Sequence, residues 1–130
     1  MQAEQGRFRD LEVWKESVAL ARDIYRLTSS FPADERFGLA SQLRRAAVSV
    51  PSNIAEGSVR RSRRQFRHYV EIALGSLAEI ETQLEIAADF RPGSPTDAVE
   101  TRMRRVRRML YGLCDALDRA PMYAKTQGPS

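Results

Sequence analysis

Cysteine and histidine, two residue types that often bind metals or carry out catalysis, are scarce in this sequence. It has one cysteine, Cys114, and one histidine, His68, among 130 residues. A single cysteine cannot form an internal disulfide, so no oxidising compartment is implied and a cytoplasmic location is expected. One Cys and one His also exclude a zinc site built from these two residue types, and the di-metal site of helical bundles needs two Glu-x-x-His pairs. We therefore expect no metal, no cofactor and no enzymatic activity.

Long apolar runs and glycine-rich phosphate loops are missing as well. The stretches without a charge are far shorter than the roughly 18 to 20 apolar residues that span a bilayer, and residues 1–10 are polar, without an apolar signal segment. The patterns G-x-x-x-x-G-K-[ST], G-x-G-x-x-G and G-x-S-x-G do not occur. β-branched residues nowhere alternate over more than a few positions. We expect no membrane contact and an all-α fold.

The composition is that of one globular domain. Apolar residues make up 42% and charged residues 29% of the chain, which is too apolar for a disordered protein. No Gly/Ser linker or repeat of 20 to 50 residues divides it. The sequence predicts a single domain over residues 1–120 and a frayed C-terminal tail over 121–130.

Apolar residues recur at steps of three and four in four segments. These segments predict helices over about 11–29, 34–57, 63–87 and 95–120, joined by short loops. Short loops make neighbouring helices antiparallel, so we expect an up-down-up-down four-helix bundle. Pro51 falls inside the second segment and predicts a kink or a short break there.

Two of the predicted helices begin with capping signals. Ser62 and Gln65 fit the S-x-x-Q capping box. Ser94 is the predicted N-cap of the last helix, with Pro95 at its first position.

The apolar surface exceeds one stripe on some helices. The first helix offers two adjacent stripes, and the third adds Tyr69, Ile72 and Leu74 beside its heptad positions. A helix that is apolar over more than half its circumference usually needs a second partner, so we predict a homo-oligomer. A wide core stripe in a monomer is the alternative.

Arginines dominate the charge, because 19 of the 21 cations are Arg and the net charge is only +4. The densest cluster comprises Arg60, Arg61, Arg63, Arg64 and Arg67. The functional interpretation is a phosphate-binding surface where the second helix meets the third. The alternative is a solvated turn whose arginines pair with acids of a neighbouring helix or subunit, such as Asp115 and Asp118. Both interpretations stay open.

A second cluster lies in the middle of the last helix and comprises Arg102, Arg104, Arg105, Arg107 and Arg108. An antiparallel pairing places it opposite Glu79, Glu81 and Glu85 of the third helix, which carries five acids and no base between residues 71 and 89. We expect ion pairs across this helix pair or across a subunit interface.

Polar residues and a glycine interrupt the apolar pattern at two places. Asn53 and Glu56 precede Gly57, the expected C-terminal cap, and predict a satisfied capping network. A binding site is the alternative. Gly75 lies in the middle of a helix, where glycine costs about 1 kcal/mol relative to alanine. We expect a close approach of another helix at Gly75.

The stretch 42–57, QLRRAAVSVPSNIAEG, followed by Phe66 and by 72–79, IALGSLAE, resembles the bacterial 23S rRNA-intervening sequence protein family. The segment 11–15, LEVWK, and Phe31-Pro32 fit the same pattern, so the resemblance covers roughly residues 8–118. It implies a cytoplasmic four-helix bundle that assembles into a ring-like pentamer. Besides Pro51, the matching positions, assigned to the kink and to inter-helix contacts, are Asn53, Glu56, Gly57, Arg61, Gly75, Ser76 and Glu79.

A similar fold occurs in accessory variability determinant proteins, which are basic pentamers that work with a reverse transcriptase and nucleic acid. By analogy, the expected function is RNA binding by a non-enzymatic oligomer. The partner expected on this analogy is RNA or a protein that processes nucleic acid. The alternative is a structural or adaptor oligomer that binds a protein partner and uses its arginines in helix and subunit ion pairs.

Overall fold

The computed structural model describes residues 7–35, 37–89 and 97–127, with side chains up to residue 119. The described backbone is almost entirely helical and contains no strand. Its elements are α2 (Arg7–Asp10), α3 (Glu12–Thr28), a 3-10 turn (Ala33–Glu35), α4 (Leu39–Ser58), α5 (Arg63–Ala87) and α6 (Asp97–Gln127). The predicted start of the last helix at Ser94 and Pro95 lies outside the described residues.

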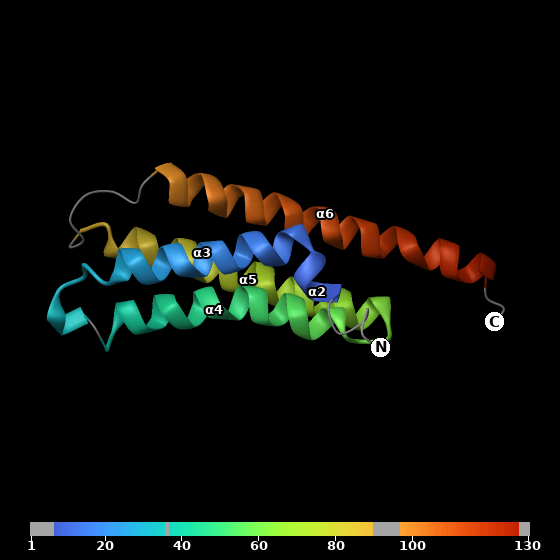
Figure 1. The fold of residues 1–130 in the computed structure, drawn as a ribbon, viewed down its shortest axis with the longest axis horizontal. Helices are drawn as coiled ribbons and strands as arrows, with labels where there is room; N and C mark the ends of the chain where they lie inside the picture. Colours follow the sequence, from blue (N-terminus) through green and yellow to red (C-terminus); the bar gives the residue numbers. More distant parts are fainter. Residues whose placement is uncertain (1–6, 36, 90–96, 128–130) are drawn as a thin grey trace.

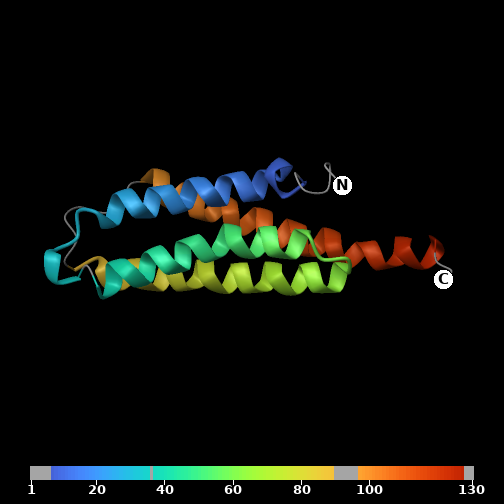
Figure 2. The ribbon, with the colours of Figure 1, turned by 60° about the horizontal axis from the view of Figure 1, so that its bottom comes forward.

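The four long helices lie side by side, and the chain reverses direction from each to the next (Figure 1). α4 packs against α3 and α5, and α6 packs against α5 and α3, so the four helices surround one core. A view turned about the long axis shows the same arrangement (Figure 2). The predicted all-α four-helix bundle is confirmed.

The core consists of the apolar residues that the heptad spacing selects. On α5, Val70, Ala73, Leu77 and Ile80 are almost completely buried. On α6, Leu110 is buried in the same core, together with residues of α3 and α4. α4, α5 and α6 therefore face the core with the stripes that their sequences predict. Of the two adjacent stripes on α3, the one with Leu20 and Ile24 is buried, whereas Tyr25 on the other is 45% exposed.

α4 remains helical through Pro51, and its backbone shows no break between Leu39 and Ser58. Proline removes the hydrogen bond to the carbonyl of Ala47. Pro51 is buried, however, and packing against the bundle holds the helix together on both sides of it. The predicted short break is absent, and the kink stays a prediction.

Gly57 was expected to cap α4 and Gly75 to allow a close approach of another helix, and the structure shows neither role. Gly57 lies inside the last turn of α4, which ends at Ser58. A Cβ on Gly57 would lie 2.8 Å from both Phe66 Cδ1 and Tyr69 Cβ, so α5 approaches α4 closely here. A Cβ on Gly75 would meet nothing within 4 Å. The close approach within the chain is therefore at Gly57, because the end of α4 and the start of α5 converge at the corner that joins them.

α6 is longer than the sequence predicts. Its backbone is helical past Pro121 to Gln127, and its C-terminal end extends beyond the ends of α4 and α5 (Figures 1 and 2). The backbone from residue 121 is thus helical as far as Gln127, whereas the fraying expected of this tail stays a prediction, and residues 128–130 lie outside the described residues. A proline leaves one carbonyl without its partner but does not by itself end a helix.

The replacement Gly57→Ala should lower the free energy of unfolding by about 1–3 kcal/mol, because its methyl group would overlap Phe66 and Tyr69. Gly112→Ala is the matched control, since a Cβ at Gly112 also meets nothing within 4 Å. This control should raise stability by about 1 kcal/mol through helix propensity. Urea denaturation followed by circular dichroism measures both. Equal stabilities of the two variants would contradict the close approach.

Candidate nucleic-acid interface

The first arginine cluster lies at the corner where α4 ends and α5 begins. Arg60 and Arg61 belong to the turn after α4, and Arg63, Arg64 and Arg67 lie in the first turns of α5. Ser62 is the N-cap of α5, and its side chain accepts a 3.0 Å hydrogen bond from the backbone N–H of Gln65. This cap begins the helix at the predicted residue and places the five arginines around one end of the bundle.

Arg60 is held in place by α4 and α5 together. Its guanidinium forms an ion pair with Glu56 and donates a 2.9 Å hydrogen bond to the Tyr69 hydroxyl. The same guanidinium lies 4.9 Å from the centre of the Tyr69 ring. Glu56 of the family motif thus orients an arginine of the cluster rather than capping the helix.

Arg67 is also paired. Its Nε lies 2.6 Å from Asp118 Oδ1 on α6, and Glu71 pairs with it one turn further along α5. Asp118 and Glu71, in that order, raise the pKa of the Arg67 guanidinium. The structural interpretation of the cluster, which named Asp118 as a partner, is therefore right for Arg67.

Arg61 and Arg64 differ from these two. Both side chains are exposed, and neither makes an ion pair or hydrogen bond with another described residue. Arg63, exposed as well, lies between them in sequence. The corner thus has two arginines held by ion pairs, Arg60 and Arg67. Its other three arginines are exposed, and two of these, Arg61 and Arg64, are unpaired among the described residues.

An open pocket of about 620 Å³ lies in this corner. Every residue of its wall carries a cationic or hydrogen-bonding group; the wall consists of Arg60, Ser62, Arg64, Gln65, His68 and Tyr69. Arginine presents a planar fork of donors that matches phosphate oxygens. The pocket and the unpaired arginines beside it can accept the phosphate groups of a nucleic acid.

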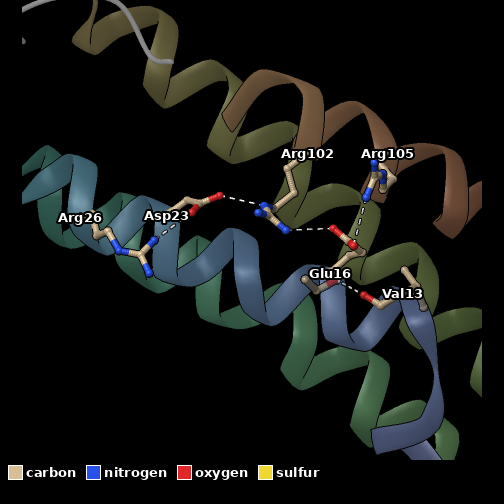
Figure 3. Close-up of polar contacts among 7 residues, drawn as sticks. Val13, Glu16, Asp23, Arg26, Arg102 and Arg105 are labelled. Atoms are coloured by element: carbon tan, nitrogen blue, oxygen red, sulfur yellow. Dashed lines mark hydrogen bonds and ion pairs between the residues drawn. The ribbon is translucent and has the colours of Figure 1, made fainter. Parts of the chain in front are cut away.

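The second arginine cluster turns mainly toward α3. Arg102 Nε lies 2.9 Å from Asp23 Oδ2 and its Nη1 lies 3.0 Å from Glu16 Oε1 (Figure 3). Arg105 Nη1 lies 3.2 Å from the other oxygen of Glu16. The side chains of Glu16 and Asp23 are only 19% and 16% exposed, so this network closes the contact between α3 and α6.

The pairing predicted for this cluster is right at one place only. Arg107 pairs with Glu81 of α5, whereas Glu79 and Glu85 are exposed. The sequence analysis missed Glu16 and Asp23. Their seven-residue spacing on one face of α3 is the signal that could have indicated them.

The polar residues of α4 form a contact with α5 beside the core. Ser49 Oγ and Ser76 Oγ share a 2.7 Å hydrogen bond, and Asn53 Nδ2 donates to Ser49 Oγ at 2.9 Å and to its carbonyl at 2.8 Å. Ser76 thus makes an inter-helix contact, whereas both hydrogen bonds of Asn53 lie within α4 and orient Ser49. Arg61 and Glu79, assigned to the same contacts, are exposed and form no hydrogen bond with the described residues.

Groups for other chemistry are sparse in the part of the chain that the structure describes. Cys114 is buried, and burial raises the pKa of its thiol, so its reactive thiolate is disfavoured. Among the described residues, no three of His, Cys, Asp or Glu are placed to hold a metal ion. No described helix is both long and apolar enough to cross a bilayer.

The fold and the corner define an α-helical bundle with outward arginines at one end. The chain belongs to the 23S rRNA-intervening sequence protein family, whose sequence model matches residues 9–112. The match includes α3, α4, α5 and half of α6, and with them the arginine corner, so the resemblance noted in the sequence is confirmed. None of the curated proteins compared with the chain matches it.

The replacement Arg102→Ala should lower the free energy of unfolding by about 1–2 kcal/mol, because it removes the partner that Asp23 and Glu16 have in common. Asp23 then keeps only Arg26, and Glu16 keeps only Arg105. Arg108→Ala removes the same charge from an exposed position of the same helix and should change stability by less than about 0.5 kcal/mol. Urea denaturation of both variants measures the difference. A loss in Arg102→Ala no larger than in Arg108→Ala would show that the network does not stabilise the bundle.

Proposed function

We propose that this protein is a non-enzymatic, cytoplasmic homo-oligomer that binds nucleic acid, with RNA as the preferred ligand, through the arginine corner. The corner comprises Arg60, Arg61, Arg63, Arg64 and Arg67. One observation carries the proposal: Arg61 and Arg64 extend from a corner that is fixed by the ion pairs of its neighbours, and have no acidic partner among the described residues.

Local helix energetics support a role beyond folding. Cations near a helix N-terminus are unfavourable by some tenths of a kcal/mol each, because the N-terminal end of the helix dipole is positive. Arg64 and Arg67 lie in the first turns of α5; Arg67 is balanced there by two acids, whereas Arg64 has no acidic partner among the described residues. Bound phosphate groups would supply the missing negative charge and would also favour the N-terminus of α5.

An oligomer would multiply this weak binding. The family resemblance implies five subunits, so five corners would share one particle. Linked sites bind a long polymer more tightly than a single site does, because the second contact forms at a high effective concentration.

A second candidate function is a structural or adaptor oligomer with a protein partner. It is favoured by the observation that Arg60, Arg67, Arg102, Arg105 and Arg107 all pair with acids of the chain. In that function the arginines hold helices together, and the corner need not bind a ligand.

Charge reversal at the two unpaired arginines distinguishes the two functions. The double variant Arg61→Glu with Arg64→Glu should bind a labelled single-stranded RNA of mixed sequence at least tenfold more weakly than the wild type in fluorescence anisotropy. The slope of log K against log salt should become shallower by about 1.4, at roughly 0.7 per lost phosphate contact on a single strand. The matched control, Arg104→Glu with Arg108→Glu, makes the same charge change on the exposed face of α6 and should retain most of the affinity.

Circular dichroism and light scattering complete the test. The Arg61/Arg64 variant should keep the helical signal and the particle mass of the wild type. Loss of assembly in that variant would assign these arginines to a subunit interface. If the wild-type protein does not bind RNA at low salt, the result would contradict nucleic-acid binding and favour the adaptor function.

A further inference from the structure

Two exposed faces of the bundle have apolar residues that none of the described residues covers. The first is a groove of about 440 Å³ between α3 and α4, here called the basic groove. Tyr25 and Val48 are 45% and 44% exposed along it. Its wall is apolar with a cationic edge and consists of Val18, Ala21, Arg22, Tyr25, Arg26, Val48 and Pro51.

The second face runs along the outside of α5 and is here called the acidic stripe. Residues three and four apart share one face of a helix, and the exposed positions with this spacing are Ile72, Gly75, Glu79, Thr82 and Ile86. Ile72 and Ile86 are 39% and 57% exposed. Glu79 makes no ion pair with other described residues, and neither does Glu85, which precedes Ile86 in sequence. The stripe therefore has apolar and negatively charged side chains.

The acidic stripe also contains a glycine, Gly75. Glycine in a helix interior lowers stability relative to alanine. Apart from the local backbone of α5 itself, no atom of the described residues would come within 4 Å of a Cβ at this position. The fold of a single chain therefore gives no packing reason for glycine here, whereas a close approach from outside the chain would give one.

We infer that the acidic stripe of one copy docks into the basic groove of the next copy. A helix face with apolar residues fits a groove between two helices, and Gly75 would let the two backbones approach. Arg26 already pairs with Asp23, so Arg22 is the cation of the groove edge without an ion pair among the described residues. Pairing groove with groove would bring two copies of Arg22 into one contact, and pairing stripe with stripe would do the same for Glu79. Like charges brought together oppose association, so the two unlike faces pair with each other.

The contact is therefore heterologous, and its repetition gives a ring where the rotation closes. This inference rests on the oligomer in the proposed function and adds the two surfaces that form it. It does not involve the arginine corner, which lies at the end of the bundle.

Two single variants and their mixture test the inference by size exclusion coupled to light scattering. Gly75→Gln fills the gap in the stripe with a better helix former, and Val48→Asp places an acid in the groove. Each variant alone should run at the mass of one chain, 14.7 kDa, whereas the wild type should run at a multiple of it. An equimolar mixture should form a species of twice the chain mass, because each variant retains the one intact face that the other needs.

Gly112→Gln is the matched control on α6, where a Cβ also meets nothing within 4 Å, and it should assemble like the wild type. If Val48→Asp fails to fold by circular dichroism, Arg22→Glu replaces it as the groove variant. Wild-type assembly in Gly75→Gln, or a mixture that stays at the mass of one chain, would overturn the docking of stripe into groove. In either case the oligomer of the proposed function would stand, whereas a wild type at the mass of one chain would overturn both.

RNA binding separates this inference from the other half of the proposed function. Gly75→Gln leaves the arginine corner intact, so it should still bind RNA, with an affinity reduced by the loss of linked sites. The Arg61/Arg64 variant should show the reverse, with assembly kept and RNA binding lost. Gly75→Gln that assembles normally but no longer binds RNA would place the stripe in ligand binding and overturn the inference.

Discussion

Burial of one apolar stripe from each of four helices is the constraint on which the rest of the structure depends. Leu20, Leu43, Leu77 and Leu110 come from the four different helices and are at most 1% exposed. A side chain of this size contributes roughly 1.5–3 kcal/mol when it is fully buried. Once these stripes meet in one core, the rotation of every helix is set, and with it the direction in which each polar residue points.

That rotation divides the arginines into two groups. Arg102 and Arg105 point from α6 toward half-buried acids of α3 and strengthen the contact between the first and last helices of the bundle. Arg60 and Arg67 have similar roles at the α4–α5 corner. These four arginines hold helices together through ion pairs. At the unpaired Arg61 and Arg64, an external anion would not have to displace a carboxylate of the described residues.

The proposed assembly and the proposed ligand fit one geometry. The arginine corner lies at one end of the bundle, whereas the basic groove and the acidic stripe lie along its sides. Cyclic symmetry would place every copy of the corner at the same height on a ring. Phosphate binding by Arg61 and Arg64 would then be repeated along one rim, and the backbone of a single polymer could follow it.

The sequence alone determined the features that depend on near neighbours in the chain. Apolar periodicity predicted the four helices and the core residues of α4, α5 and α6, and the Ser62 capping box predicted where α5 begins, because both act within a few residues. Only the tertiary structure decided that Arg102 pairs with Glu16 and Asp23, that Gly57 is the point of close contact, and that Gly75 is open to solvent. These outcomes depend on which helices become neighbours and how each is rotated, and many residues distant in sequence settle that together through the packing of one core.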